Sequence, residues 1–283
     1  MTFVRVLQTA PETLTHTFSV DEVPTDAAGA VTCTLKRLGG TEVASGAATH
    51  PGPDGQYAFT VPGQAELDSL TLDWSGSFAG SPVTVRDHVE VAGGFLFNLA
   101  RARAKLRIDP RETSTMDLAE LRVEVEDEAE NIAGHAFVPR FERVAVSGRG
   151  RRELLVPRWL IRRVRAVSVD GVAWSTIDVS GISASSSGVL TRMFGAPWPA
   201  GNSNIILEYE HGDSFVPPEV ASAAAFRLRS LISAPKSTVP ERALSFSVEG
   251  GVYRLSTPGA KRTGIPTIDA VYERYGLDAG GFA

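Results

Sequence analysis

Six carboxylate side chains lie close together in residues 120–130: Glu120, Glu124, Glu126, Asp127, Glu128 and Glu130. Glu124, Asp127 and Glu128 have the spacing that places side chains on one helix face, where they could hold a divalent cation. A solvated or ion-paired helix face is the commoner use of such a cluster. We therefore predict no metal site here, and interpret this helix face as a contact surface for water, cations or an arginine-rich partner.

A second charged stretch contains seven arginines: Arg149, Arg151, Arg152, Arg158, Arg162, Arg163 and Arg165. Arginine clusters neutralise phosphates, so nucleic-acid binding is one interpretation, and a solvated strand face is another. Only Trp159 interrupts the cluster with an aromatic ring, and the chain is acidic, with a pI near 5.6. A third interpretation is a head-to-tail contact between identical subunits, which closes into a ring. The candidate contact residues are Glu120, Glu124, Asp127, Glu128, Arg151, Arg152, Arg162 and Arg163.

Motifs of enzymes and cofactor sites are absent from the sequence. There is no nucleophile elbow, no zinc-protease helix, no P-loop and no dinucleotide fingerprint. The five histidines are scattered, and His211-Gly212-Asp213 is typical of a turn at a strand end rather than of a metal site. We predict no catalytic residue, no cofactor and no metal. A hydrolase site assembled from distant residues is the alternative.

The acidic residues must be positioned by a helix over residues 113–134. Leu118, Leu121, Val125, Ala129 and Ile132 form one apolar stripe at spacings of three and four. Thr113 or Ser114 can cap the start, Asp117 suits the first turn, and Gly134 follows the end. This is the clearest helix in the sequence, and we expect its apolar stripe to pack against the rest of the chain.

The N-terminal part reads as short strands separated by glycine, proline and aspartate. Alternation such as Leu70, Leu72 and Trp74 recurs through residues 13–91 and predicts an immunoglobulin-like β-sandwich over residues 1–93. This region has eleven acidic and four basic residues, whereas the remainder is slightly basic, which favours a domain boundary at Gly93-Gly94. The single Cys33 rules out an internal disulfide and suits a reducing compartment. No signal peptide or membrane span is expected.

The rest of the chain alternates between helical and strand patterns. Residues 94–234 are predicted to be a helical domain with an inserted β region at about 141–210, in which Asp170-Gly171 marks a hairpin that returns through Val172–Val179. Residues 235–283 are predicted to be an extended C-terminal arm with a hairpin and a short helix beginning at Pro266, and without a core of its own. The expected fold class is therefore α+β.

From Asp117 onward, the order of features resembles the head-to-tail adaptors (gp6-like connectors) of tailed double-stranded DNA phages. The resemblance covers about 170 residues. It is carried by Ala133-Gly-His-Ala-Phe-Val-Pro-Arg140, Leu154-Leu-Val-Pro157, Val164-Arg-Ala-Val-Ser-Val-Asp-Gly171, Gly188-Val-Leu-Thr-Arg192 with Trp198, Ile206-Leu-Glu-Tyr-Glu-His-Gly212, Val216-Pro-Pro-Glu-Val220 and Thr263-Gly-Ile-Pro-Thr-Ile-Asp269 with Tyr272. The N-terminal sandwich departs from the minimal connector and looks like the extra domain of some adaptors.

The resemblance implies a structural virion protein, assembled in the host cytoplasm, that forms a dodecameric ring at the phage neck. Such a ring binds the portal protein and a stopper or tail-completion protein, and DNA passes through its lumen without sequence-specific binding. The acidic helix would then line the channel or face the arginines of a neighbouring copy. The arm would dock on a neighbour or on the portal through Ile265, Ile268 and Tyr272.

Two other functions remain open from the sequence. One is a carbohydrate- or host-binding accessory protein, with the sandwich as the binding module. Outside the sandwich, stacking of Trp159 or Trp198 on sugar is an alternative to a core or turn role of these rings. The other is a different neck or tail component, such as a stopper, which is usually a shorter β-barrel without long helices. An aromatic platform on the sandwich favours the first, and a low helix content favours the second.

Overall fold

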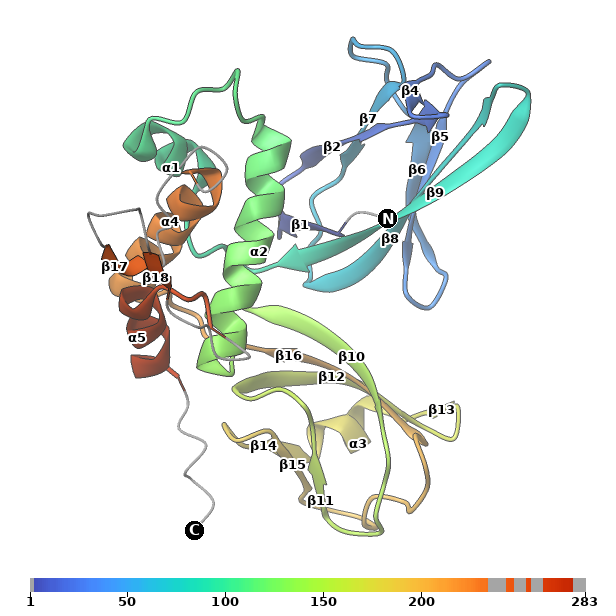
Figure 1. Ribbon diagram of the computed structural model, residues 1–283. Coiled ribbons are helices and arrows are strands. Elements are labelled where there is room, and N and C mark those ends of the chain that lie inside the picture. Colours follow the sequence, from blue (N-terminus) through green and yellow to red (C-terminus); the bar gives the residue numbers. More distant parts are fainter. Residues whose placement is uncertain (1–2, 234–242, 247–252, 256–261, 277–283) are drawn as a thin grey trace. The chain divides into compact units, whose positions relative to one another are not determined.

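The computed structural model describes residues 3–233, 243–246, 253–255 and 262–276 (Figure 1). The chain divides into two compact units, Met1–Gly94 with Arg140–Arg143, and Phe95–Pro139 with Val144–Ala283. Strands and helices are both present, as the predicted α+β class requires. None of the helices in the described part of the chain is long and apolar enough to cross a membrane.

The first unit is built from strands alone. One sheet has the order β1-β9-β8-β5-β6, in which β1 (Phe3–Leu7) runs parallel to β9 (Ser81–Ala92) and the other pairs are antiparallel. The other strands of this sheet are β8 (Asp68–Phe78), β5 (Thr32–Arg37) and β6 (Glu42–Ala47). Separate pairs are formed by β2 (Glu12–Thr17) with β7 (Gln56–Val61), and by β3 (Ser19–Val20) with β4 (Val23–Pro24).

Side chains from these sheets share one core, as in a two-sheet sandwich. The predicted alternation holds along β8, where Leu70, Leu72 and Trp74 are fully buried. The Trp74 indole N–H donates to the Asp87 carboxylate at 2.9 Å, which satisfies the buried polar atom of this ring. Burial raises the pKa of the Cys33 thiol to about 12, so this thiol is unreactive. The immunoglobulin-like type of the sandwich stays a prediction.

Four helices of the second unit share one hydrophobic core. They are α1 (Leu99–Leu106), α2 (Thr115–Ala133), α4 (Pro218–Ser233) and α5 (Pro266–Arg274). The predicted helix is confirmed as α2, which begins with a capping box between Ser114 and Asp117 and ends at Gly134 with a φ of 78°. Leu118, Val125 and Ala129 of the predicted stripe are buried, and they anchor α2 in the core.

The C-terminal segment differs from the expected arm. Ile265, Ile268 and Tyr272 are buried in the same core as α2 and α4, instead of lying exposed for docking on another molecule. The loop before α5 is fixed by Asp269, whose Oδ1 accepts hydrogen bonds from the Thr263 backbone N–H and hydroxyl at 2.9 and 2.7 Å. The predicted hairpin is present as β17 (Ala243–Phe246) and β18 (Tyr253–Leu255). The rest of the predicted arm lies outside the described residues.

The inserted β region contains two small sheets around a third core. One sheet has the order β10-β16-β12-β13, with β10 (Arg140–Val146), β16 (Ile205–His211), β12 (Ile161–Val169) and β13 (Val172–Ala173). The other has the order β11-β15-β14, with β11 (Glu153–Leu155), β15 (Val189–Arg192) and β14 (Ile182–Ala184). The predicted hairpin turn at Asp170-Gly171 is confirmed, since both residues have a positive φ.

The returning strand of this hairpin is shorter than predicted. It ends at Ala173, and the short helix α3 (Thr176–Ser180) follows. The reason is local, because the Ser175 hydroxyl oxygen accepts from the Asp178 backbone N–H at 3.2 Å and caps α3. A serine followed three residues later by an aspartate is typical of a helix start. The strand-like alternation of Val172–Val179 led to the prediction of a strand instead.

One buried histidine makes the stability of this unit depend on pH. His135 follows α2 and is 8% exposed. Burial lowers the pKa of its imidazole, while the Ala133 carbonyl and the charge of Asp213 raise it by less. The unfolded chain therefore takes up a proton at a pH where the folded chain resists it, so stability is present above about pH 6.5 and is lost as the pH falls below it.

Replacing His135 by glutamine should reduce this loss. We expect the free energy of unfolding of the wild type to fall more steeply between about pH 7 and pH 5 than that of His135→Gln. Urea unfolding at several pH values measures both slopes, and the difference between them isolates His135 from the other histidines. Identical slopes for the two proteins would show that His135 titrates alike in the folded and unfolded states.

Candidate functional site

Three carboxylates of α2 form an exposed surface, which we name the acidic stripe: Glu120, Glu124 and Asp127. They are separated by four and three residues, so they follow one face of the helix. This face points away from the buried Leu118, Val125 and Ala129 of the same helix. Within the described residues, no group of three or more His, Cys, Asp or Glu side chains is arranged to hold a metal ion. The stripe is therefore described as an exposed acidic surface on one side of α2.

Two other carboxylates of the predicted acidic face do not belong to this surface, which corrects the sequence interpretation. Glu126 is fully buried, and its Oε1 accepts the Leu96 backbone N–H at 2.8 Å. Glu128 is half-buried and binds the Arg227 guanidinium of α4 through two hydrogen bonds of 2.6 and 2.7 Å. Each of these carboxylates is thus engaged within its own chain. Helical spacing alone did not reveal this, because the partners come from distant parts of the sequence.

The seven arginines are distributed over several places. Arg149 and Arg151 line a hollow of about 470 Å³ with Leu155. Arg152 donates from Nη1 to the Arg192 carbonyl at 3.1 Å, and Arg165 lies 3.9 Å from Glu210. The last two of the candidate arginines, Arg162 and Arg163, are exposed on β12. Part of the arginine cluster is therefore engaged by the β region itself.

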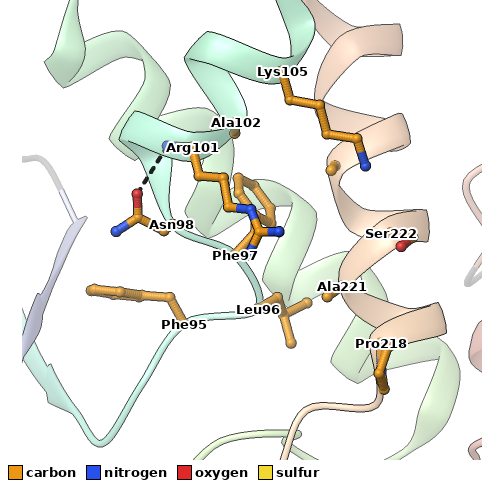
Figure 2. A pocket seen from close by; sticks show the side chains of 11 residues that line it. Phe95, Leu96, Phe97, Asn98, Arg101, Ala102, Lys105, Pro218, Ala221 and Ser222 are labelled. Atoms are coloured by element: carbon orange, nitrogen blue, oxygen red, sulfur yellow. Dashed lines mark hydrogen bonds between the residues drawn. The ribbon is translucent and has the colours of Figure 1, made fainter.

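A groove between α1 and α4 has a cavity volume of about 450 Å³ (Figure 2). Apolar and small side chains form its floor, and two cations, Arg101 and Lys105, lie along the α1 side. The lining residues are Phe95, Leu96, Phe97, Asn98, Arg101, Ala102, Lys105, Pro218, Ala221, Ser222 and Ala225. We name this surface the basic groove, since its lining contains no acidic residue.

The local sequence explains why the groove is open and basic. Asn98 caps α1 by accepting the Arg101 backbone N–H at 3.0 Å, which begins the helix at Leu99 and places Arg101 in its first turn (Figure 2). Arg101 and Lys105 are one turn apart, and both are exposed. Ala221, Ser222 and Ala225 are too small to fill the space beside α1. The floor and the two cations therefore form a single surface.

The adjoining segment is fixed by buried contacts of α2. The Arg122 guanidinium carbon lies 3.3 Å from the centroid of the Phe95 ring, and Arg122 is 4% exposed. Together with the hydrogen bond from the Leu96 backbone N–H to Glu126, this contact fixes the position of Phe95 and Leu96, which line the groove. The basic groove is therefore supported by Arg122 and by Glu126, and Glu126 is one of the carboxylates that the sequence analysis assigned to an outward acidic face.

The groove was not predicted from the sequence, although the sequence contains a signal for it. The small residues of α4 flank the buried stripe of Val220, Ala224 and Leu228 and continue onto the outward side of the helix, where Ser222 is exposed. A run of small side chains on an outward helix face indicates a place where another element can approach closely. The sequence does not show that α1 lies beside this face of α4, because that arrangement depends on the tertiary structure.

Solved structures similar to this chain include two from gene transfer agent (GTA) particles. No protein-family model matches the chain, and no curated protein matches it. A chain of the neck of an empty GTA particle computed with C6 symmetry is 14% identical with a TM-score of 0.40, and the match covers 66% of this chain and 92% of that one. A chain of the virion of a native gene transfer agent (GTA) particle is 16% identical with a TM-score of 0.38, covering 64% and 90%. Similarity at this level does not by itself establish a shared fold.

Proposed function

We propose that this chain is a structural protein of a virion neck, which acts by its place among identical copies and catalyses no reaction. The copies form a ring, dodecameric in the adaptors that the sequence resembles, between a portal protein and a stopper or tail-completion protein. DNA passes through the lumen of the ring without sequence-specific binding. The protein is assembled in the host cytoplasm and is part of the mature virion.

The observation that carries the proposal is the pair of oppositely charged surfaces on one helical layer. The acidic stripe on α2 and the basic groove between α1 and α4 are both exposed, and each is larger than a single ion pair. Surfaces of opposite charge on different elements of one chain suit heterologous contacts between copies. The names of the two similar structures agree in kind with a neck role, but the proposal does not depend on them.

The placement of individual residues is part of the proposal. Glu120, Glu124 and Asp127 face either the lumen, where they would repel the DNA backbone, or a neighbouring copy. Arg151, Arg152, Arg162 and Arg163 belong to the β region and would contact a partner protein other than a copy of this chain. Because Ile265, Ile268 and Tyr272 are buried within the chain, docking through them would require α5 to leave its own core.

Two alternatives are less well supported. A carbohydrate-binding sandwich needs exposed aromatic rings, but Tyr57, Trp74 and Phe78 of the sandwich are buried and Phe59 is half-buried. In the inserted region, Trp198 is fully buried and stacks on Trp174 at a centroid distance of 5.1 Å. A β-barrel stopper is disfavoured because four helices build the core of the second unit.

Electron microscopy of particles tests the proposed function directly. Particles produced with the chain should contain it as a ring between head and tail, and particles produced without it should be heads that lack attached tails. A chain fused to a compact tag at its N-terminus should add density at the neck. The proposal is wrong if the neck is mapped and lacks this chain, or if purified protein turns over a substrate.

A further inference from the structure

We propose that the basic groove binds the acidic stripe of a second copy of this chain, so that copies join head to tail. This inference rests on the proposed function only in assuming that the chain works among identical copies. It assigns both halves of the contact, which neither the sequence resemblance nor the similar structures provide.

Matching charge spacing is the first argument. Arg101 and Lys105 are four residues apart on α1, and Glu120 and Glu124 are four residues apart on α2. Four residues of an α-helix rise about 6 Å, so the two cations and the two carboxylates have the same separation. Two helices laid side by side can therefore form both ion pairs at once. α1 contains no acidic residue, so nothing within it opposes the incoming carboxylates.

Shape is the second argument. Ala102 on α1 and Ala221, Ser222 and Ala225 on α4 leave room for another helix to approach to the usual interaxial distance of about 8–10 Å. Apolar surface is also available on both sides of the contact. Phe97 and Pro218 contribute apolar surface to the groove lining, whereas Leu96 is only 3% exposed. On α2, Met116 is 38% exposed and precedes Glu120 by one helical turn. The face of α2 that enters the groove would thus bring a hydrophobic side chain as well as carboxylates.

Third, the acidic stripe of a chain cannot occupy the basic groove of the same chain. The stripe lies on the side of α2 away from the buried Leu118 and Val125, and the groove uses the side of α4 on which Ser222 is exposed. Both surfaces therefore face outward from the core that α2 and α4 share. Different surfaces on the two partners make the contact heterologous, and repeated heterologous contacts generate a ring when the rotation closes.

The basic groove fits the acidic stripe better than the arginine cluster does. Arg152 contacts the Arg192 carbonyl and Arg165 contacts Glu210, so both arginines already interact within the β region of their own chain. The groove combines two exposed cations with an apolar floor in one concave surface. Charged residues at the edge of an apolar contact set its specificity and its association rate.

Charge reversal in pairs tests the contact. The groove variant is Arg101→Glu with Lys105→Glu, and the stripe variant is Glu120→Lys with Glu124→Lys; all four residues are exposed, so both variants should fold. Each variant alone juxtaposes like charges and should self-associate about tenfold or more weakly than the wild type. An equimolar mixture should associate like the wild type, because the acidic groove of one meets the basic stripe of the other. Sedimentation at low ionic strength measures all three.

A matched control changes the same charge elsewhere. Arg151→Glu with Arg152→Glu has the same net charge as the groove variant and should associate like the wild type. Loss of association in this control, together with unchanged association of the groove variant, would move the contact to the arginine cluster and overturn the proposal. Failure of the mixture to associate also overturns it. In either case, microscopy of the particle neck still decides the proposed function independently.

Discussion

Replacing Tyr272 by alanine should lower the free energy of unfolding of the helical unit by about 3–5 kcal/mol, the usual cost of removing a large buried ring. Tyr272 is fully buried in α5, where it packs in the core that α2 and α4 also build. Its loss leaves a cavity that cannot close without moving α5. Urea unfolding followed by far-ultraviolet circular dichroism measures the effect, because the helices belong to the second unit and the first unit is built from strands.

Tyr272→Phe is the matched control. The Tyr272 hydroxyl is buried and has no hydrogen-bond partner among the described residues, so removing it alone should be neutral or slightly stabilising. Burial raises the pKa of this phenol above its ordinary value, which keeps it neutral at any physiological pH. If Tyr272→Ala unfolds like the wild type, α5 does not contribute to the core of its own chain. The docking role predicted from the sequence would then regain its support.

The sequence was sufficient where the deciding interactions are local. The start of α2 was predicted because Ser114 and Asp117 cap each other within four residues, and its end because Gly134 adopts a positive φ. The buried alternation of β8 and the turn at Asp170-Gly171 were likewise readable from neighbouring residues. In each case the physical cause lies within one turn or one hairpin, so no knowledge of the tertiary structure was needed.

Prediction failed where the partner comes from a distant part of the chain. Helical spacing correctly placed Glu120 and Glu124 outward, but it could not show that Leu96 donates to Glu126 or that Arg227 binds Glu128. The short helix beginning at Pro266 was also predicted, yet a short amphipathic helix near the end of a chain has the same pattern whether it packs on its own core or on another molecule. Only the tertiary structure distinguishes these cases.

The candidate site likewise combines features that the local sequence determines with features that depend on distant segments. Arg101 and Lys105 are exposed one turn apart on α1, a direction that the helical spacing of the neighbouring apolar residues indicates. The groove itself depends on α4 lying beside α1, and these helices are separated in the sequence by α2 and the whole β region. The charged residues of a contact surface can therefore be predicted from the sequence more readily than the hollow that makes the surface specific.

Glu126→Ala should destabilise the helical unit by about 3–5 kcal/mol, the cost typical of breaking a buried charged network. Two effects combine in this substitution. The Leu96 backbone N–H loses its acceptor at 2.8 Å, and the guanidinium of Arg122, one turn earlier and 4% exposed, remains buried as a cation with less negative charge around it. Urea unfolding monitored by the helix signal measures the loss.

Two variants on the same helix separate these effects. Glu126→Gln keeps an acceptor oxygen for Leu96 but removes the charge, so its cost should lie between those of the wild type and Glu126→Ala. Glu124→Ala removes an exposed carboxylate half a turn away and should change stability by no more than about 0.5 kcal/mol. Equal costs for Glu126→Ala and Glu124→Ala would mean that both carboxylates are solvated. The acidic residues of α2 would then form one continuous outward face, and the segment at Leu96 that forms part of the groove floor would lack the support described above.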